Sequence, residues 1–352
     1  PSAGALRDRL MTILKDYTKL YGRDDDEKTP GGLLEGLIKR AYAKTGKQVV
    51  VIIDEYDAPL LDVLHEDERL KDMRQVMQEF YVPLKANESM IKFCFITGIT
   101  KFSQLSIFST INNLINVTMD TMFSAICGIT EQELTEAFRE DIALLAESQQ
   151  QSYHETMVKL KQRYDGYHFT AESPDIYNPF SLINTFAKTR LDDYWFTSGT
   201  PSFLMRLLSK SDEDVMQYTG RYYDRKMFID YKADTAMPLP MIFQSGYLTI
   251  KDVDRDFNTY LLDFPNREVR EGLATLLLSN YVQPKEDAKS WLVEMVKALR
   301  TADLDGVRRL FTSFLAATPY SMRPKKTQEQ RELYFHYTFY LLMRLISCYT
   351  VY

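Results

Sequence analysis

The chain has 352 residues, too many for one small hydrophobic core, so we expect two or three domains. Hydrophobic residues make up 45% of the sequence and charged residues 26%, which is the balance of an ordinary globular protein. The net charge of −6 gives no support to nucleic-acid binding through the field of the whole protein, although a local basic face could lie within an acidic average.

Zinc or iron centres, disulfides and membrane spans are not indicated by the sequence. The three cysteines and four histidines are too widely spaced for a disulfide framework or a zinc site. Apolar runs of membrane-spanning length and a charged-then-apolar leader are both missing, which predicts a cytoplasmic protein without a membrane partner. The chain starts without methionine and stops on the apolar segment FYLLMRLISCYTVY, so we expect both ends to be cuts through a larger protein. Its oligomeric state is not indicated.

The first part of the chain alternates helical and strand patterns. Residues 6–20 and 33–44 place apolar side chains at helical spacing. Residues 49–53, VVVII, are apolar on both faces, as expected for a central parallel strand that is buried on both sides. A helical sequence pattern continues to about residue 87, and residues 91–98, IKFCFITG, are predicted to form a second strand of the same buried type. This order predicts an α/β sheet with crossover helices.

Helices dominate the pattern after residue 125. Thr130 and Glu133 form a capping box that opens a helix. Asn178 and Thr200 each precede a proline, which predicts two further helix starts with an N-cap residue and a proline at the first helical position.

A β-hairpin is predicted farther along, from residues 246–250 and 258–264 on either side of a charged turn. A helix is predicted at residues 266–279, and the sequence from about residue 285 to the end again has a helical pattern. Helices followed by a hairpin are compatible with a small winged-helix-like module.

Two acids directly follow the first strand. Because the carboxyl ends of parallel strands form the ligand-binding edge of open α/β sheets, Asp54 and Glu55 are delivered to that edge. Apolar residues followed by Asp-Glu form the arrangement called Walker B in P-loop ATPases. There Asp54 would orient Mg²⁺ on the phosphates of ATP, and Glu55 would position or deprotonate the attacking water. The alternative is a strand end whose acids cap the next helix, with Asp57 as an N-terminal acid.

Polar residues also follow the second strand. In P-loop sheets the strand beside the acidic one commonly ends in a polar residue that senses the γ-phosphate, and Thr97 stands at that place. Thr100, Lys101 and Ser103 follow in a loop that contains glycine, where Lys101 could neutralise phosphate charge. The alternative is a helix-capping threonine and a solvated lysine.

The sequence lacks the phosphate-binding half of such a site. A P-loop needs G-x-x-x-x-G-K-[ST], whose backbone amides surround the phosphates. Gly46-Lys47 fails this pattern because Gln48 follows it and Ala41 stands where the first glycine should be. The pair also enters a strand where a P-loop leaves one.

Seven motifs stand in order over roughly residues 45 to 280: VVVIIDEYDAPLLD, ITGITKFSQLSIFSTINNL, YDGYHF, YNPFSLINTF, YWFTSGTPSFL, QSGYLTI and DFPNREVR. Together they resemble the ordered motifs of the bacterial AAA-ATPase-like proteins. The resemblance matches Asp54 and Glu55 to the Walker B acids and residues 97–103 to the sensor-type loop. Trp195 and residues 197–201 match an aromatic segment of the family to which we assign no role.

The resemblance also implies that both active centres are truncated in this chain. Family members carry a P-loop upstream of the matching region and a PD-(D/E)XK nuclease-like domain downstream. The fragment would then be inactive, with an ATPase activity that needs ATP and Mg²⁺ only in the intact parent.

The predicted fold class is a partial P-loop NTPase-type α/β sheet, followed by a mainly helical region with a winged-helix-like β-hairpin. Residues 1–125 would form the ATPase-like domain and residues 126–200 a helical subdomain. Residues 201–280 would form a winged-helix-like lid, and residues 281–352 the helical start of a truncated nuclease-like domain.

Other interpretations remain open. The chain could be a nucleic-acid-binding or protein-interaction module that uses the hairpin as a wing, or a structural relic with a dead ATP site. The hairpin turn, residues 251–256, carries more acid than base, which weighs against DNA. The FIDYK segment, residues 228–232, contains a nuclease-like D-x-K that arises often by chance.

Aromatic residues form a further cluster that could serve either of two purposes. They could stack on adenine or on bases, or pack helices against loops, and we favour packing. These residues are Tyr164, Tyr167, Phe169, Tyr194, Trp195 and Phe196.

Overall fold

The computed structural model describes residues 2–64, 66–99, 114–198, 215–229, 238–281 and 288–316, with a few more between 332 and 343. These residues form two compact units, each described here by itself. The first unit comprises residues 1–127, 167–174 and 200–263, and the second comprises residues 128–166, 175–199 and 264–352. Our four-part division of the chain stays a prediction.

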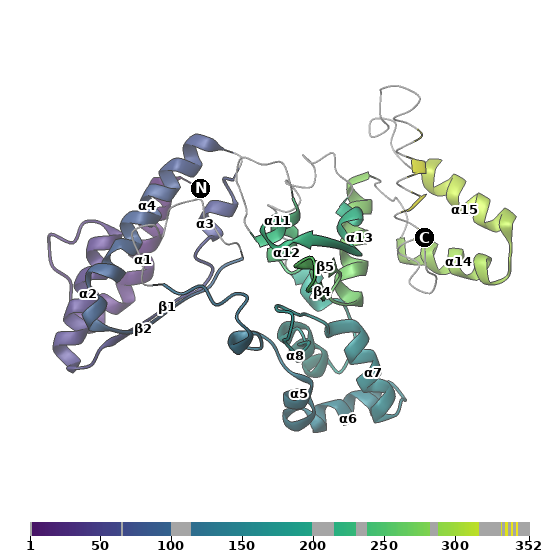
Figure 1. The fold of residues 1–352 in the computed structure, drawn as a ribbon, viewed down its shortest axis with the longest axis horizontal. Helices are drawn as coiled ribbons and strands as arrows, with labels where there is room; N and C mark the ends of the chain where they lie inside the picture. The colour runs from purple at the N-terminus through teal and green to yellow at the C-terminus, as the bar shows by residue number, and fades with distance from the viewer. Residues whose placement is uncertain are drawn as a thin grey trace. The chain divides into compact units, whose positions relative to one another are not determined.

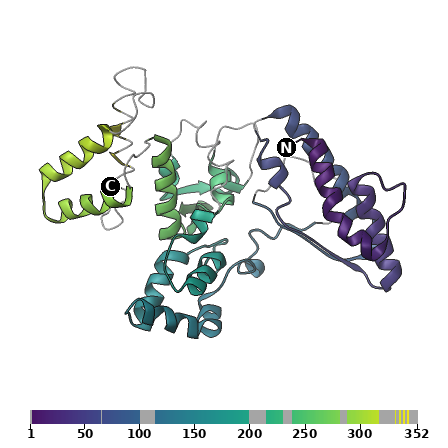
Figure 2. The same ribbon diagram turned by 180° about the vertical axis from the view of Figure 1, so that it is seen from behind.

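Three long helices form the core of the first unit's N-terminal part, where they pack against one another (Figures 1 and 2). They are α1 (Ala3–Tyr21), α2 (Pro30–Thr45) and α4 (Asp67–Ala86), with the short helices α3 (Ala58–Leu61) and η1 (Glu88–Met90) between elements. Thr29 caps α2, Pro30 takes its first position, and Gly46 ends it in the left-handed conformation at φ 65°.

Helices α2 and α4 approach each other closely at Gly31. A Cβ atom added there would lie 2.4 Å from the backbone oxygen of Glu79, so a larger residue would force the helices apart. Both helices also carry apolar side chains that are buried in the core. Leu33, Ile38, Met73, Val76 and Met77 are each at most 2% exposed.

Strands β1 (Val49–Ile53) and β2 (Ile91–Ile96) pair in parallel, which confirms the predicted strands and direction. The prediction that β1 is buried on both faces is wrong for the described part of the chain. Val50 and Ile52 are 51% and 70% exposed, and Phe93, the partner of Val50, is 55% exposed. The helices lie along one side of the two strands (Figure 1), and the residues of β1 that alternate with Val50 and Ile52 are partly buried.

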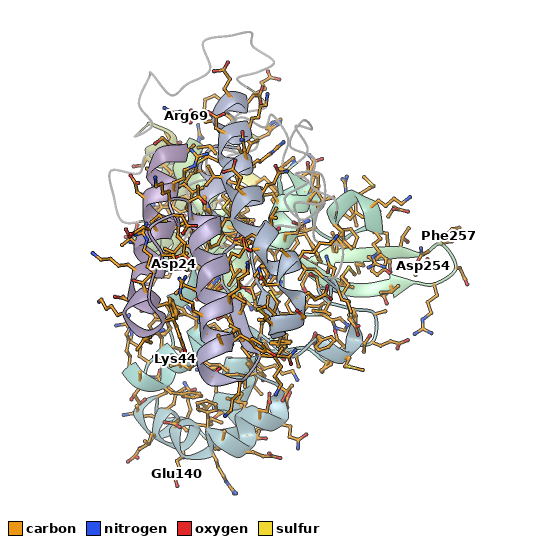
Figure 3. All side chains as sticks on the ribbon, turned by 90° about the vertical axis from the view of Figure 1, so that its left-hand side faces the viewer. Asp24, Lys44, Arg69, Glu140, Asp254 and Phe257 are labelled. Atoms are coloured by element: carbon orange, nitrogen blue, oxygen red, sulfur yellow. The ribbon has the colours of Figure 1, made fainter. Side chains whose placement is uncertain are left out.

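The first unit also holds an antiparallel sheet of three strands in the order β3-β5-β4. Strands β4 (Thr249–Asp254) and β5 (Thr259–Asp263) form the predicted hairpin, and β3 (Arg221–Asp224), which we did not predict, adds to its edge. Phe257 is 79% exposed at the hairpin tip, next to Asp254 at the end of β4 (Figure 3). The short helices of this unit are η2 (Thr121–Phe123), η3 (Val215–Tyr218), α11 (Arg225–Ile229) and α12 (Leu239–Gln244).

The second unit is helical. Its helices are α5 (Glu131–Ala137), α6 (Arg139–Ser148), α7 (Tyr153–Tyr164), α8 (Pro179–Lys188), α9 (Tyr194–Ser198), α13 (Arg267–Tyr281), α14 (Ala288–Arg300) and α15 (Leu304–Ala316). The predicted capping box of Thr130 and Glu133 is confirmed, with both reciprocal hydrogen bonds present. Asn178 caps α8 as predicted, whereas Thr200 lies outside the described residues.

A cluster of fully buried side chains holds α5 to α8 together. It consists of Leu134, Ile142, Leu145, Leu160, Tyr164, Tyr177 and Leu182. The two tyrosines in this cluster are completely inaccessible, so they pack the core and present no ring for stacking on a base. Within the described ranges, no helix is long and apolar enough to cross a membrane.

Candidate functional site

The carboxyl ends of β1 and β2 bring Asp54 and Thr97 together. The Thr97 N–H donates to the Ile53 carbonyl at 2.8 Å, and the Tyr56 N–H donates to the Thr97 carbonyl at 2.9 Å. The first bond extends the pairing one residue beyond β2, and the second ties Tyr56, three residues beyond β1, to the same threonine. At this edge the Thr97 hydroxyl donates a hydrogen bond to Oδ1 of Asp54. Two oxygen-bearing side chains from neighbouring strands therefore form one cluster.

Glu55 follows in an uncommon backbone conformation. Its φ is 52°, in the left-handed region, which costs a residue with a side chain about 1–2 kcal/mol. Its N–H donates to Oδ1 of Asp54 at 3.0 Å, and both carboxylates are exposed to solvent. Strained positions of this kind occur preferentially at functional sites, where the surrounding structure holds them in place.

Asp57 is the acid whose role the sequence analysis missed. It is 0% exposed and precedes α3, but its side chain makes no capping hydrogen bond to that helix. Instead, its Oδ1 accepts a hydrogen bond of 3.2 Å from the N–H of Ile99, in the segment after β2. The alternative in which these acids cap the next helix therefore does not describe Asp57.

Two buried or half-buried groups, the Tyr81 hydroxyl and the Cys94 thiol, lie near each other. Tyr81 of α4 is 2% exposed, and burial raises the pKa of its hydroxyl, with smaller contributions from Tyr56, Asp57 and Cys94. Burial also raises the pKa of the Cys94 thiol. Both groups are therefore neutral near pH 7.

The remaining predicted nucleotide-binding residues lie outside the described part of the chain. They are Thr100, Lys101 and Ser103 of the loop after β2. Asp230 and Lys232 of the FIDYK segment lie outside it as well, whereas Phe228 is fully buried.

Trp195 of the aromatic segment is held in the second unit, by a buried acid. Its backbone N–H donates to Oε1 of Glu268 at 2.8 Å, and the Ser181 hydroxyl donates to Oε2 of the same carboxylate at 2.7 Å. Glu268 is 1% exposed, and burial raises the pKa of its carboxyl above the ordinary value. Both carboxylate oxygens are used to fasten α9 and α8 to α13, which is a structural role.

The donors at this edge suit a magnesium ion. Mg²⁺ prefers hard oxygen ligands and is usually held by one or two carboxylates together with waters and phosphates. Asp54, Glu55 and Thr97 supply such oxygens at one exposed edge, and they fit this pattern of few protein ligands. Across the described residues, no group of three or more His, Cys, Asp or Glu side chains is arranged to hold a metal.

Comparison with known proteins supports a family relationship for the first part of the chain. Residues 2–108 match the model of a family described as predicted AAA-ATPases. An uncharacterised protein encoded in the vnfD 5′ region of Azotobacter chroococcum mcd 1 is 31% identical over 306 residues. That alignment covers 86% of this chain but 57% of the relative.

The chain thus spans little more than half the length of this relative. No solved structure matches. The family match contains both strands and every residue of the candidate site from Asp54 to Ser103. Over these residues the chain is similar to the predicted AAA-ATPases.

Proposed function

We propose that this chain carries the magnesium and water end of an ATP hydrolysis site, which a P-loop completes in the intact parent protein. The observation that carries the proposal is the hydrogen bond from Thr97 to Asp54, at the carboxyl edge of two parallel strands. Open α/β sheets bind their ligands at this edge. The family match over residues 2–108 supports a nucleotide as that ligand.

Each residue has a separate task in this proposal. Asp54 would hold Mg²⁺, whose charge offsets the negative charge of the phosphates. Glu55, exposed beside it, would accept a proton from the attacking water or orient that water. Thr97 fixes the rotamer of the Asp54 carboxylate and presents its oxygen to the same edge. Thr100, Lys101 and Ser103 would contact the phosphates from the following loop.

The chain alone would then bind nucleotide weakly and not turn it over, because the phosphate-binding amides of a P-loop are missing from its sequence. The resemblance further suggests that the parent couples ATP hydrolysis to a PD-(D/E)XK nuclease-like domain. The alternative of a DNA-binding wing gains no support from the hairpin. Its exposed tip carries Asp254, Asp256 and Phe257 around one basic residue, Arg255.

The test uses the parent protein that contains these residues. We expect wild type to bind ATP in the presence of Mg²⁺ and to hydrolyse it. Glu55→Gln should retain ATP affinity and lose turnover by about 100-fold or more, because it removes the group that activates water. The matched control is Glu68→Gln, the same exchange at an exposed position in the first turn of α4. Hydrolysis by Glu55→Gln at the wild-type rate would refute the assignment of Glu55.

A further inference from the structure

The buried carboxylate of Asp57 needs an explanation. Burying an ionised carboxylate is costly unless hydrogen bonds or charges compensate it. A residue whose only purpose was to start α3 could remain at the surface and cap the helix, as Thr130 does at α5. Asp57 is completely buried, and it makes no such cap. Its burial therefore indicates that the side chain binds a group outside α3.

A hydrogen bond from Ile99 shows which group this side chain binds. Oδ1 of Asp57 accepts from the N–H of Ile99, which is 42 residues away in sequence. Ile99 stands two residues after Thr97, whose N–H and carbonyl are already bonded to Ile53 and Tyr56. The end of β1 and the segment after it thus bind the segment after β2 through these three hydrogen bonds and through the Thr97 hydroxyl on Asp54. The bond from Ile99 joins a fully buried side chain to the backbone.

Gly98 is a second and independent sign of the same arrangement. A Cβ atom at this position would lie 2.6 Å from Oδ1 of Asp57 and 2.6 Å from the Tyr56 ring. Asp57 and the ring therefore occupy the space that any side chain at position 98 would need. The chain between Thr97 and Ile99 passes this close to Asp57 because its residue has no side chain.

We infer that Asp57 is a positioning residue, which holds the segment after β2 so that Thr97 meets Asp54. This inference rests on the proposed ATP site and deepens it. Asp57 is not expected to touch the nucleotide, because its side chain is inaccessible to solvent. It would act through the backbone of Ile99, and its effect on catalysis would follow from the placement of Thr97.

The first experiment needs no activity and uses the 352-residue chain. Amide hydrogen exchange at Ile99 is measured by mass spectrometry in wild type, Asp57→Ala, Gly98→Ala and Asp57→Asn. We expect exchange about threefold to tenfold faster in Asp57→Ala and Gly98→Ala, the range expected for one lost hydrogen bond. Asp57→Asn keeps the Oδ1 acceptor and should stay closer to wild type.

Helices α2 and α4 provide the internal reference, and Asp72→Ala removes an exposed acid of α4 as the matched control. Unchanged exchange at Ile99 in both Asp57→Ala and Gly98→Ala would overturn the inference. Equal acceleration at Ile99 and throughout α2 and α4 would overturn it as well, because it would show a general loss of stability.

The second experiment measures ATP hydrolysis by the parent. Asp57→Ala should lower kcat by about tenfold to 100-fold with little change in ATP affinity, and Asp57→Asn should recover part of the loss. A parallel loss of affinity and kcat, or no rescue by asparagine, would contradict a positioning role. If wild type neither binds nor hydrolyses ATP, the proposed function fails, whereas the exchange result at Ile99 still decides whether Asp57 holds the segment.

Discussion

Tyr164 and Tyr177 are fully buried in the same cluster, but they differ in their hydroxyl groups. The Tyr164 hydroxyl donates to the Asp192 carbonyl at 2.8 Å and accepts from the Thr185 hydroxyl at 2.9 Å and the Asp192 N–H at 3.1 Å. The Tyr177 hydroxyl is buried without a hydrogen-bond partner among the described residues. The same side chain therefore satisfies its polar atom at one position and leaves it unsatisfied at the other.

Replacing each tyrosine by phenylalanine should have opposite consequences. Tyr164→Phe leaves the Asp192 backbone groups and Thr185 without their shared partner, and should lower the free energy of unfolding by about 1–2 kcal/mol. Tyr177→Phe removes an unsatisfied polar atom and should be neutral or slightly stabilising. Urea unfolding followed by circular dichroism measures both. Equal destabilisation by the two variants would contradict this account.

The ion pair of Glu27 and Arg40 should make stability depend on acid pH. Burial alone would raise the pKa of Glu27, but hydrogen bonds from Arg40 and from the Asp24 N–H hold the pKa below its ordinary value of 4.5. A lowered folded pKa means that the stabilisation is complete above about pH 4.5 and disappears as pH falls through the folded pKa. Arg40→Met should therefore cost about 3 kcal/mol at pH 7, and less near pH 3.

Lys39 offers a matched control for this experiment. It forms an ion pair of 2.6 Å with Glu35 on the same helix, but both side chains are exposed. Lys39→Met should cost less than about 0.5 kcal/mol, because exposed pairs contribute little. Chemical unfolding at pH 7 and pH 3 provides the comparison. A loss for Arg40→Met that does not shrink in acid would show that the pair contributes mainly through packing of the arginine stem.

Glu268 should show the opposite dependence on pH. Burial raises the pKa of its carboxyl, while hydrogen bonds from Ser181 and the Trp195 N–H and the charge of Arg163 act against this rise, and Asp193 adds to it. The folded state then keeps the proton longer than the unfolded state does. This acid should therefore make the protein less stable as pH rises from about 4.5 through the raised pKa.

Glu268→Gln should remove that dependence. The glutamine oxygen can accept from the Trp195 N–H, and the Ser181 hydroxyl can turn to accept from its amide. We expect the stability of Glu268→Gln relative to wild type to increase between pH 4.5 and pH 8, as measured by thermal unfolding. Glu140→Gln, an exchange at an exposed residue of α6 that points into solvent (Figure 3), should show no such trend. A flat difference for Glu268→Gln would contradict the raised pKa.

The close approach at Gly31 predicts a steric effect on stability. Gly31→Ala would place a methyl group 2.4 Å from the Glu79 oxygen and should cost about 1–3 kcal/mol, because neither helix can move without loss of packing. Gly4→Ala meets nothing closer than 3.9 Å in α1 and should stabilise the protein by up to about 1 kcal/mol. Thermal unfolding distinguishes the two. Similar effects of both changes would show that α2 and α4 can separate freely.

Features that depend on neighbouring residues could be predicted from the sequence. The capping box of Thr130 and Glu133 and the N-cap at Asn178 are specified by a few adjacent residues, and the structure contains both. The parallel pairing of β1 with β2 follows from two apolar runs joined by a helix. At the candidate site, the same rule brought Asp54 and Thr97 to one edge.

Features that depend on distant residues could not be predicted in this way. Strand β3 has four residues, and its pairing is decided by β5, which lies much farther along the chain. Asp57 stands before a proline-containing helix, so its local pattern indicates a cap, whereas its actual bond goes to Ile99, 42 residues away. Likewise, the sequence VVVII is compatible with burial on both faces of the strand. It does not specify which other elements pack on each face.

Among the described residues, the exposed face of β1 and β2 has a practical consequence for handling the protein. Val50, Ile52 and Phe93 form a patch of β-branched and aromatic side chains on a short parallel sheet. Such surfaces promote self-association when they meet one another in concentrated solution. Ile52→Thr, which keeps the β-branched shape and adds a hydroxyl, is therefore the first substitution we would use to obtain this chain at high concentration for crystallisation or spectroscopy.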